Sequence, residues 1–170
     1  IARMKILIKQ AKITDKNSPF NGMTKDILIE GDTIVKIEDT ISDDDANLIE
    51  ANDMHASIGW VDLKADFCDP GFEHKETIES GLDAAASGGY THVAVLPSTQ
   101  PVVDGKSQIQ YMQRKSEYHA TQLHSIGTIT VGMKGENLSE MYDMSQNGVK
   151  LFSDDLSHVS SGIMYRALLY

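Results

Sequence analysis

Two polar residues at the end of a predicted buried strand are the part of the sequence best placed to do chemistry. Lys64 and Asp66 follow the largely apolar stretch that runs from Ile58 to Leu63. Because alternate residues of an extended strand point to the same side, both side chains should project together. Enzymes built on parallel sheets place their reactive groups at the carboxyl ends of the strands. Lys64 and Asp66 are therefore the first candidate site.

Other residues of catalytic type have plainer expected roles. Cys68 is the only cysteine, and it could act as a nucleophile only if a neighbouring base lowered the pKa of its thiol. No nearby feature of the sequence supplies that base, so we expect an inert loop thiol. Ser98 is expected in a turn and Asp104 at the start of a helix as its cap. The six histidines include no i, i+2 or i, i+4 pair, so none forms a zinc motif by itself.

The elements that must position these residues fall into two parts. Up to residue 56, alternating segments and turn residues predict antiparallel strands at 4–13, 25–30, 33–38 and 47–51. From residue 57, strands are expected at 58–63, 91–96, 122–131 and 149–152. They alternate with helices at 74–87, 104–118, 136–146 and from 160 or 161 onward. Four consecutive strand–helix units predict a parallel sheet, as an open α/β domain or as half of an eight-unit barrel.

Composition narrows the class of protein. The net charge of -10 argues against a nucleic-acid-binding surface. The single cysteine excludes an internal disulfide framework and fits a reducing, cytoplasmic environment. No stretch approaches the roughly 18 apolar residues of a membrane-spanning helix. The chain stops inside the apolar run from Ala167 to Tyr170, which indicates a fragment.

Several longer motifs resemble the dihydroorotases of the amidohydrolase superfamily, and most closely the bacterial class similar to multifunctional-complex dihydroorotases. They include Ile58-Gly59-Trp60-Val61-Asp62-Leu63, Asp69-Pro70-Gly71-Phe72-Glu73-His74, Ala84-Ala85-Ala86-Ser87-Gly88-Gly89, Leu96-Pro97-Ser98-Thr99 and Phe152-Ser153-Asp154-Asp155. The resemblance implies the N-terminal part of a (β/α)8 TIM barrel. Residues 57–170 would form the first half of the barrel, and residues 1–56 would contribute strands to a small β-sandwich domain.

The resemblance also implies a zinc centre that this sequence does not reproduce. The positions of the family's His-x-His metal ligands hold Lys64 and Asp66. The position of the arginine that binds the substrate carboxylate holds Cys68, and that of a substrate-contacting asparagine holds Ser98. Asp155 is the one metal-ligand position that matches.

These replacements change what the site can bind. A lysine ammonium has no lone pair near neutral pH and repels a metal ion. We expect Lys64 to form an ion pair with Asp66 or Asp155 in the space that a metal would occupy, and we expect no cofactor. The role of Lys150 has two interpretations. Related hydantoinase-type enzymes carry a carbamylated, metal-bridging lysine at a similar place, whereas a strand-start lysine paired with an acid is the plainer interpretation.

The resemblance implies a dihydroorotase-like protein of pyrimidine biosynthesis that is catalytically inactive and has a structural or regulatory role. Inactive members of this kind associate with aspartate carbamoyltransferase, and a homo-oligomer is expected. The alternative is an active zinc amidohydrolase that hydrolyses a cyclic amide, with altered metal ligands completed by a C-terminal half. A third reading is a free-standing α/β binding module, which predicts a soluble monomer.

Overall fold

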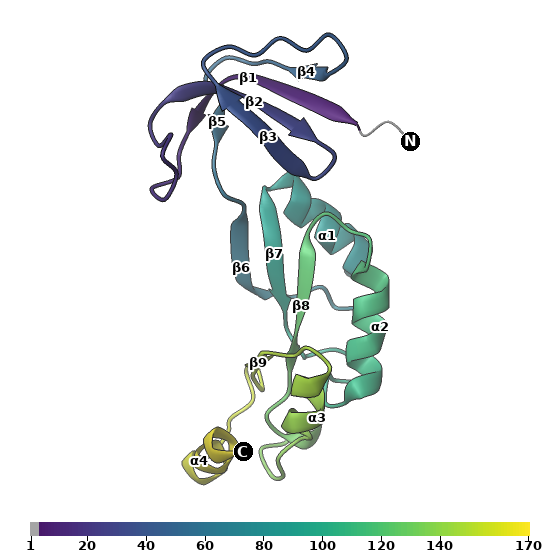
Figure 1. The fold of residues 1–170 in the computed structure, drawn as a ribbon. Coiled ribbons are helices and arrows are strands. Elements are labelled where there is room, and N and C mark those ends of the chain that lie inside the picture. Colours follow the sequence, from purple (N-terminus) through teal and green to yellow (C-terminus); the bar gives the residue numbers. More distant parts are fainter. Residues whose placement is uncertain (1–3) are drawn as a thin grey trace. The chain divides into compact units, whose positions relative to one another are not determined.

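The computed structural model describes residues 4–170, which divide into two compact units (Figure 1). One unit ends at Ile58 and the other runs from Gly59 to Tyr170. The division falls two residues beyond the predicted boundary between 56 and 57. Among residues 4–170, no helix has the length and apolar composition that crossing a membrane requires.

The first unit is a five-stranded sheet of β1 (Lys5–Ile13), β2 (Thr24–Glu30), β3 (Thr33–Glu38), β4 (Asn47–Ile49) and β5 (His55–Ala56). The strand order is β3-β2-β1-β4, with β5 also paired to β1. The β1–β2 and β2–β3 pairs are antiparallel, whereas β4 and β5 run parallel to β1. The sequence missed β5, because two residues are too few to show an alternating pattern.

A buried carboxylate connects strands β1 and β2 to the segment that follows β3. Asp26 is fully buried and forms an ion pair with Lys9. It also accepts hydrogen bonds from the backbone amides of Gln10 and Ile41, each at 2.9 Å. Burial by itself raises the pKa of Asp26, but these hydrogen bonds outweigh it and hold the pKa well below its usual value.

The second unit is a parallel sheet with helices between its strands. Its strands are β6 (Trp60–Ala65), β7 (Tyr90–Val95), β8 (Gln122–Gly127) and β9 (Leu151–Phe152), hydrogen-bonded in that order. Its helices are α1 (Ile78–Ser87), α2 (Lys106–Ser116), α3 (Met141–Gln146) and α4 (Ser161–Leu169), with a short 3-10 turn η1 (Val131–Met133). The predicted succession of four strand–helix units is confirmed.

One face of this sheet carries the main core. Figure 1 shows α1 and α2 along the same side of β7 and β8. Val93 and Val95 of β7 pack there against buried residues of the helices, among them Ile78, Leu82 and Ile109. The other face carries a smaller buried cluster of Ala94, Leu96 and Ile126. On the edge strand β6, Leu63 is 69 % exposed.

Two helices start later than predicted, and their N-cap residues account for the difference. Helix α1 begins at Ile78 rather than at 74, since Thr77 forms a capping box with Ser80. Helix α2 begins at Lys106 with Gly105 as its N-cap, so the prediction that Asp104 caps it was wrong. The Asp104 carboxylate instead accepts a hydrogen bond from the backbone amide of Gly132 at 3.1 Å.

Two other elements are shorter than the apolar pattern suggested. Strand β8 ends at Gly127 rather than 131, and α3 begins at Met141 rather than 136. Between them, the backbone amides of Ile129 and Thr130 bind a side chain instead of continuing the sheet. The start of α4 agrees with the sequence, because the Ser160 side chain accepts a hydrogen bond from the amide of Ile163.

Candidate functional site

Three of the predicted site residues meet at the carboxyl ends of the parallel strands. Lys64 lies near the end of β6, Ser98 in the loop after β7 and Asp155 in the loop after β9. The Nζ atom of Lys64 is 3.3 Å from Oδ1 of Asp155. The hydroxyl of Ser98 donates a hydrogen bond of 2.8 Å to Oδ2 of the same carboxylate. Each oxygen of Asp155 therefore faces a polar group of this chain.

The two contacts of Asp155 differ in kind. Among the described residues, Oδ1 is buried and has no hydrogen-bond partner, although the Lys64 ammonium lies within ion-pair distance. The approach of Lys64 is thus a charge attraction without hydrogen-bond geometry. Its side chain is 62 % exposed, whereas that of Asp155 is 13 % exposed. An ion pair with one solvated partner contributes about 0–1 kcal/mol to stability.

Asp66 does not join this group. Strand β6 ends at Ala65, so the alternation that would place Asp66 beside Lys64 stops one residue too early. Its Oδ1 accepts hydrogen bonds from the backbone amide of Cys68 at 3.1 Å and from the Cys68 thiol at 3.4 Å. Of the two ion pairs that the sequence allowed, the structure contains the one between Lys64 and Asp155.

Cys68 lies in an environment that disfavours a thiolate. Burial raises the pKa of its thiol, and the adjacent Asp66 carboxylate raises it further. A nucleophilic cysteine needs the opposite shift. The thiol therefore suits the inert role expected from the sequence.

The residue before Asp155 holds the site in place, and sequence reasoning missed it. Asp154 is 3 % exposed and accepts hydrogen bonds from the amides of Ile129 at 2.7 Å and Thr130 at 3.0 Å. It also accepts a hydrogen bond from the Thr130 hydroxyl. These contacts join the loop after β8 to the loop after β9. One of these adjacent aspartates is buried and the other faces the site. The sequence contains no pattern that distinguishes the two roles.

A second buried aspartate anchors the loop that carries Cys68. Asp69 is 1 % exposed and accepts hydrogen bonds from the amide of Ile78 at 3.1 Å and from the Tyr111 hydroxyl at 2.8 Å. Burial and the Asp69 carboxylate raise the pKa of Tyr111 to about 12, so the phenol remains a donor. The loop after β6 is therefore held to both α1 and α2.

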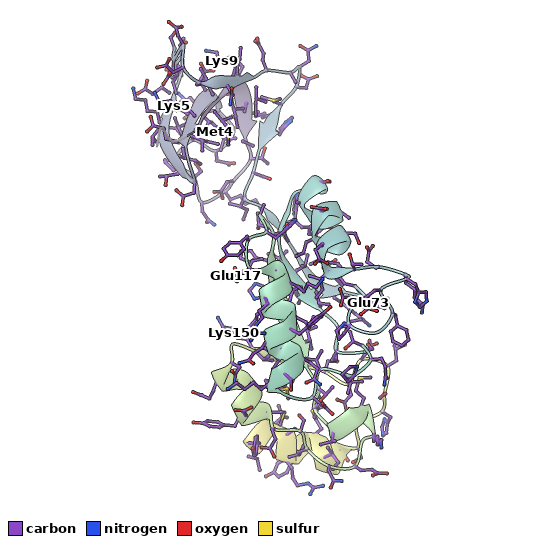
Figure 2. All side chains as sticks on the ribbon, turned by 90° about the vertical axis from the view of Figure 1, so that its right-hand side faces the viewer. Met4, Lys5, Lys9, Glu73, Glu117 and Lys150 are labelled. Atoms are coloured by element: carbon purple, nitrogen blue, oxygen red, sulfur yellow. The ribbon has the colours of Figure 1, made fainter. Side chains whose placement is uncertain are left out.

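Lys150 lies at the other end of its strand from Asp155. It precedes β9, whereas Asp155 follows that strand. Among residues 4–170, no carboxylate lies within ion-pair distance of Lys150, so the acid partner expected from the sequence is missing from this part of the chain. Lys150 lines a cavity of about 610 Å³ together with Glu117 and His124. Figure 2 labels Lys150 and Glu117 among the side chains of the second unit.

Among residues 4–170, the donors at the carboxyl ends of the strands do not make up a zinc centre. Zinc sites in proteins are built mainly from imidazole and thiolate ligands with supporting carboxylates. Here an ammonium approaches the best-placed carboxylate, Asp66 is bonded to its own loop, and Cys68 favours the protonated form. Within residues 4–170, no three His, Cys, Asp or Glu side chains are grouped closely enough to hold a metal ion.

Comparison with known proteins gives a consistent set of relatives. A family model described as Dihydro-orotase-like matches residues 56–169. The chain is 43 % identical to a protein of Syntrophotalea carbinolica named dihydroorotase, over 98 % of this chain and 40 % of that protein. A protein of the same name from Bacillus subtilis is 35 % identical, over 97 % of this chain and 39 % of its own length. The chain thus spans about two fifths of these curated relatives.

Solved structures share the fold at low identity. An L-hydantoinase from Arthrobacter aurescens superposes with a TM-score of 0.65 at 17 % identity, over 89 % of this chain and 32 % of that one. A D-hydantoinase gives 0.65 at 18 % identity, over 98 % and 37 % of the two chains. A structure described as a dihydroorotase gives 0.60 at 14 % identity, over 89 % and 42 %. The predicted half of a TIM barrel is confirmed, whereas the assignment of residues 1–56 to a separate sandwich domain stays a prediction.

Proposed function

The chain belongs to the dihydroorotase-like family, and from this premise we propose that the protein is a dihydroorotase homologue of pyrimidine biosynthesis without catalytic activity. We further propose that it lacks the family's zinc centre and has a structural or regulatory role. The observation that carries this proposal is the 3.3 Å contact between Lys64 and Asp155. A positively charged side chain stands beside the carboxylate that a metal ion would need.

The chemistry of the reaction explains why this contact matters. Hydrolysis or closure of a cyclic amide requires an activated water and a polarised carbonyl, and a zinc centre supplies both when it is present. Asp155 could contribute one carboxylate to such a centre. Its Oδ1 faces the Lys64 ammonium and its Oδ2 accepts a hydrogen bond from Ser98. The side chains of this half of the barrel therefore support charge neutralisation of Asp155 by Lys64 rather than by a metal.

Substrate recognition is weakened as well. An arginine binds a substrate carboxylate through two parallel hydrogen bonds. Cys68 stands at the matching position, and its thiol is a weak donor. Its side chain is already engaged with Asp66. This part of the chain offers no replacement for a bidentate carboxylate clamp at that position.

Zinc content and ring-opening activity of the full-length protein test the proposal. We expect no zinc whose binding depends on Asp155 and no hydrolysis of dihydroorotate when zinc is added. The variant Lys64→His should bind zinc about tenfold more tightly or better, because it replaces the ammonium beside Asp155 with an imidazole ligand. The matched control Lys64→Gln removes the charge without adding a ligand and should not gain zinc.

The opposite result would overturn the proposal. If the purified protein holds about two zinc ions per chain, loses them in Asp155→Asn and opens dihydroorotate, then it is an active amidohydrolase. One observation favours this second candidate function. Oδ1 of Asp155 is buried without a hydrogen-bond partner among the described residues. An oxygen in this state is able to act as a metal ligand.

For the regulatory role we propose aspartate carbamoyltransferase as the partner and a homo-oligomer as the state of the protein. The support is the family relationship together with the altered site. Size-exclusion chromatography with light scattering, on the full-length protein alone and mixed with the transcarbamoylase of the same organism, tests both points. A shared peak is expected. Separate elution at micromolar concentrations of both proteins would contradict the partnership.

A further inference from the structure

Two histidines distant in the sequence meet on the sheet face opposite α1 and α2. His92 lies in β7 and His124 in β8, and Nδ1 of His92 is 3.0 Å from Nε2 of His124. Their ring centroids are 5.3 Å apart with an angle of 28° between the ring planes. In the strand register Ala94 pairs with His124, so both imidazoles share a face with the Ala94 cluster. The pair is built by the sheet and not by a local motif.

The surroundings of the pair form a small cavity of about 260 Å³. Val61, Leu63 and Leu151 contribute apolar residues to its lining, and Lys150 contributes a charged one. Asp62 pairs with Val93 in the strand register, so its side chain shares the face that the helices cover. Burial lowers the pKa of His124, and the neighbouring His92 and Lys150 lower it further. A lowered pKa favours the neutral imidazole, which is the form that binds metals.

The separation of the two nitrogens suits a shared metal ion. Two nitrogens bound to one zinc ion at about 2.0–2.1 Å in tetrahedral geometry lie about 3.3 Å apart. The observed 3.0 Å is a few tenths shorter. The ring proton now between the two nitrogens would move to the outer nitrogen of its own ring through solvent, which frees both lone pairs.

We propose that His92 and His124 bind one divalent transition-metal ion on the inner face of the sheet. Imidazole ligands suit copper, nickel and zinc, and among these Cu²⁺ should bind most tightly. Among residues 4–170, no third His, Cys, Asp or Glu side chain is grouped with the pair, so this part of the chain supplies two ligands. The site is separate from Lys64 and Asp155, which lie at the carboxyl ends of the strands.

Charge in the cavity determines how tight the site is. Lys150 lines the same cavity, and its positive charge repels a cation there. The proposal therefore predicts that removing this charge strengthens binding. Lys150→Ala should strengthen Cu²⁺ binding.

Calorimetric titration of the chelator-treated full-length protein with Cu²⁺, and separately with Zn²⁺, tests the site. We expect one Cu²⁺ per chain that depends on this pair. His92→Gln and His124→Gln should each weaken it by about tenfold or more, since each removes one ligand. The matched control is His119→Gln, because His119 pairs with Asp83 elsewhere on the surface, with its Nε2 3.1 Å from the Asp83 carboxylate. That variant should retain the Cu²⁺ affinity of the wild type.

Two further measurements keep the result interpretable. Electron paramagnetic resonance of the wild-type copper complex should show two imidazole nitrogens, and this needs no variant to fold. Asp155→Asn should leave the copper site intact, so failure of this proposal is distinguishable from failure of the proposed function. Unchanged copper binding in the double variant His92→Gln, His124→Gln would overturn the proposal. A copper spectrum without two imidazole nitrogens would also overturn it.

Discussion

Asp154 and Asp155 are neighbours in the chain with opposite roles. The Asp154 carboxylate is buried and satisfied by backbone amides, so it acts as part of the scaffold. The Asp155 carboxylate faces Lys64 and Ser98, and its backbone has a φ of 49°, in the left-handed region. The fold thus uses one acid to hold the loop and presents the next one at the strand ends.

This division predicts unequal costs of truncation. Asp154→Ala should lower the free energy of unfolding of the second unit by about 2 kcal/mol or more, because buried amides lose a charged acceptor. Asp155→Ala is the matched control and should cost no more than about 1 kcal/mol, since its ionic partner is solvated. Urea unfolding followed by tryptophan fluorescence from Trp60 measures both values. Equal costs would contradict the assignment of Asp154 as the structural residue.

Asp26 predicts how the first unit responds to acid. Its pKa is lower in the folded state than the ordinary value of 3.8. A carboxylate with a depressed folded pKa contributes stability above its unfolded pKa, and the contribution is lost as the pH falls toward the folded pKa. The destabilisation caused by Asp26→Asn should therefore be large at pH 7 and should shrink steadily below pH of about 4.

Hydrogen exchange of the β1 and β2 amides at several pH values measures this effect in the first unit. Lys25→Gln is a useful comparison, because it breaks an exposed pair with Asp39 whose carboxylate is 88 % exposed. That variant should change protection little at any pH. A pH-independent effect of Asp26→Asn would contradict the role of its charge.

At the scale of elements, the contact between α1 and the loop after β6 sets how closely this helix packs. Gly81 is buried in α1, and a Cβ added there would lie 2.6 Å from the Phe67 ring. The glycine lets the ring lie against the helix backbone. Phe67 is itself buried in the main core with Leu82. The loop that carries Cys68 therefore depends on one small residue in the helix.

Replacing Gly81 by alanine should destabilise the second unit by about 1–3 kcal/mol, although alanine is the better helix former. The matched control is Gly162→Ala in α4, where an added Cβ would meet nothing within 4 Å. That change should stabilise its helix by up to about 1 kcal/mol. Thermal unfolding of both variants compares their stabilities. If Gly81→Ala were more stable than the wild type, the Phe67 ring would have to move away from the added methyl group at little cost.

At the scale of the molecule, the sheet of the second unit is open. Among the described residues, β6 pairs only with β7 and β9 only with β8, so each has an unpaired edge. The inner face between them carries exposed apolar residues, including Val61 and Leu63. Unpaired edges and apolar faces promote association. This architecture is difficult to reconcile with a free-standing monomeric binding module.

We therefore expect a polypeptide of residues 1–170 to associate when it is produced alone. Light scattering at increasing concentration should show species larger than a monomer, with the full-length protein as the control. A stable monomer with native-like hydrogen-exchange protection in β6 and β9 would contradict this expectation. Such a result would support the hypothesis of a free-standing α/β binding module.

The sequence by itself predicted the succession of strands and helices, and its resemblance to the dihydroorotases indicated the half-barrel and the family. Local periodicity and glycine stops are enough to place elements, because they reflect which face of each element is buried. The resemblance also assigned metal-ligand and substrate-binding positions of the family to Lys64, Asp66 and Cys68, and that assignment stays a prediction. The sequence pattern erred at element ends such as the start of α2, where a cap depends on a contact with the distant Gly132.

Only the tertiary structure decided which of these residues meet. Lys64 pairs with Asp155, ninety-one positions away, while Asp66 bonds to its own loop one residue beyond the strand. His92 meets His124 across a register that no local pattern encodes. The physical reason is the same in each case. Side-chain periodicity depends on neighbours within a few residues, whereas contacts between strands depend on pairing register and loop conformation, which the whole chain sets together.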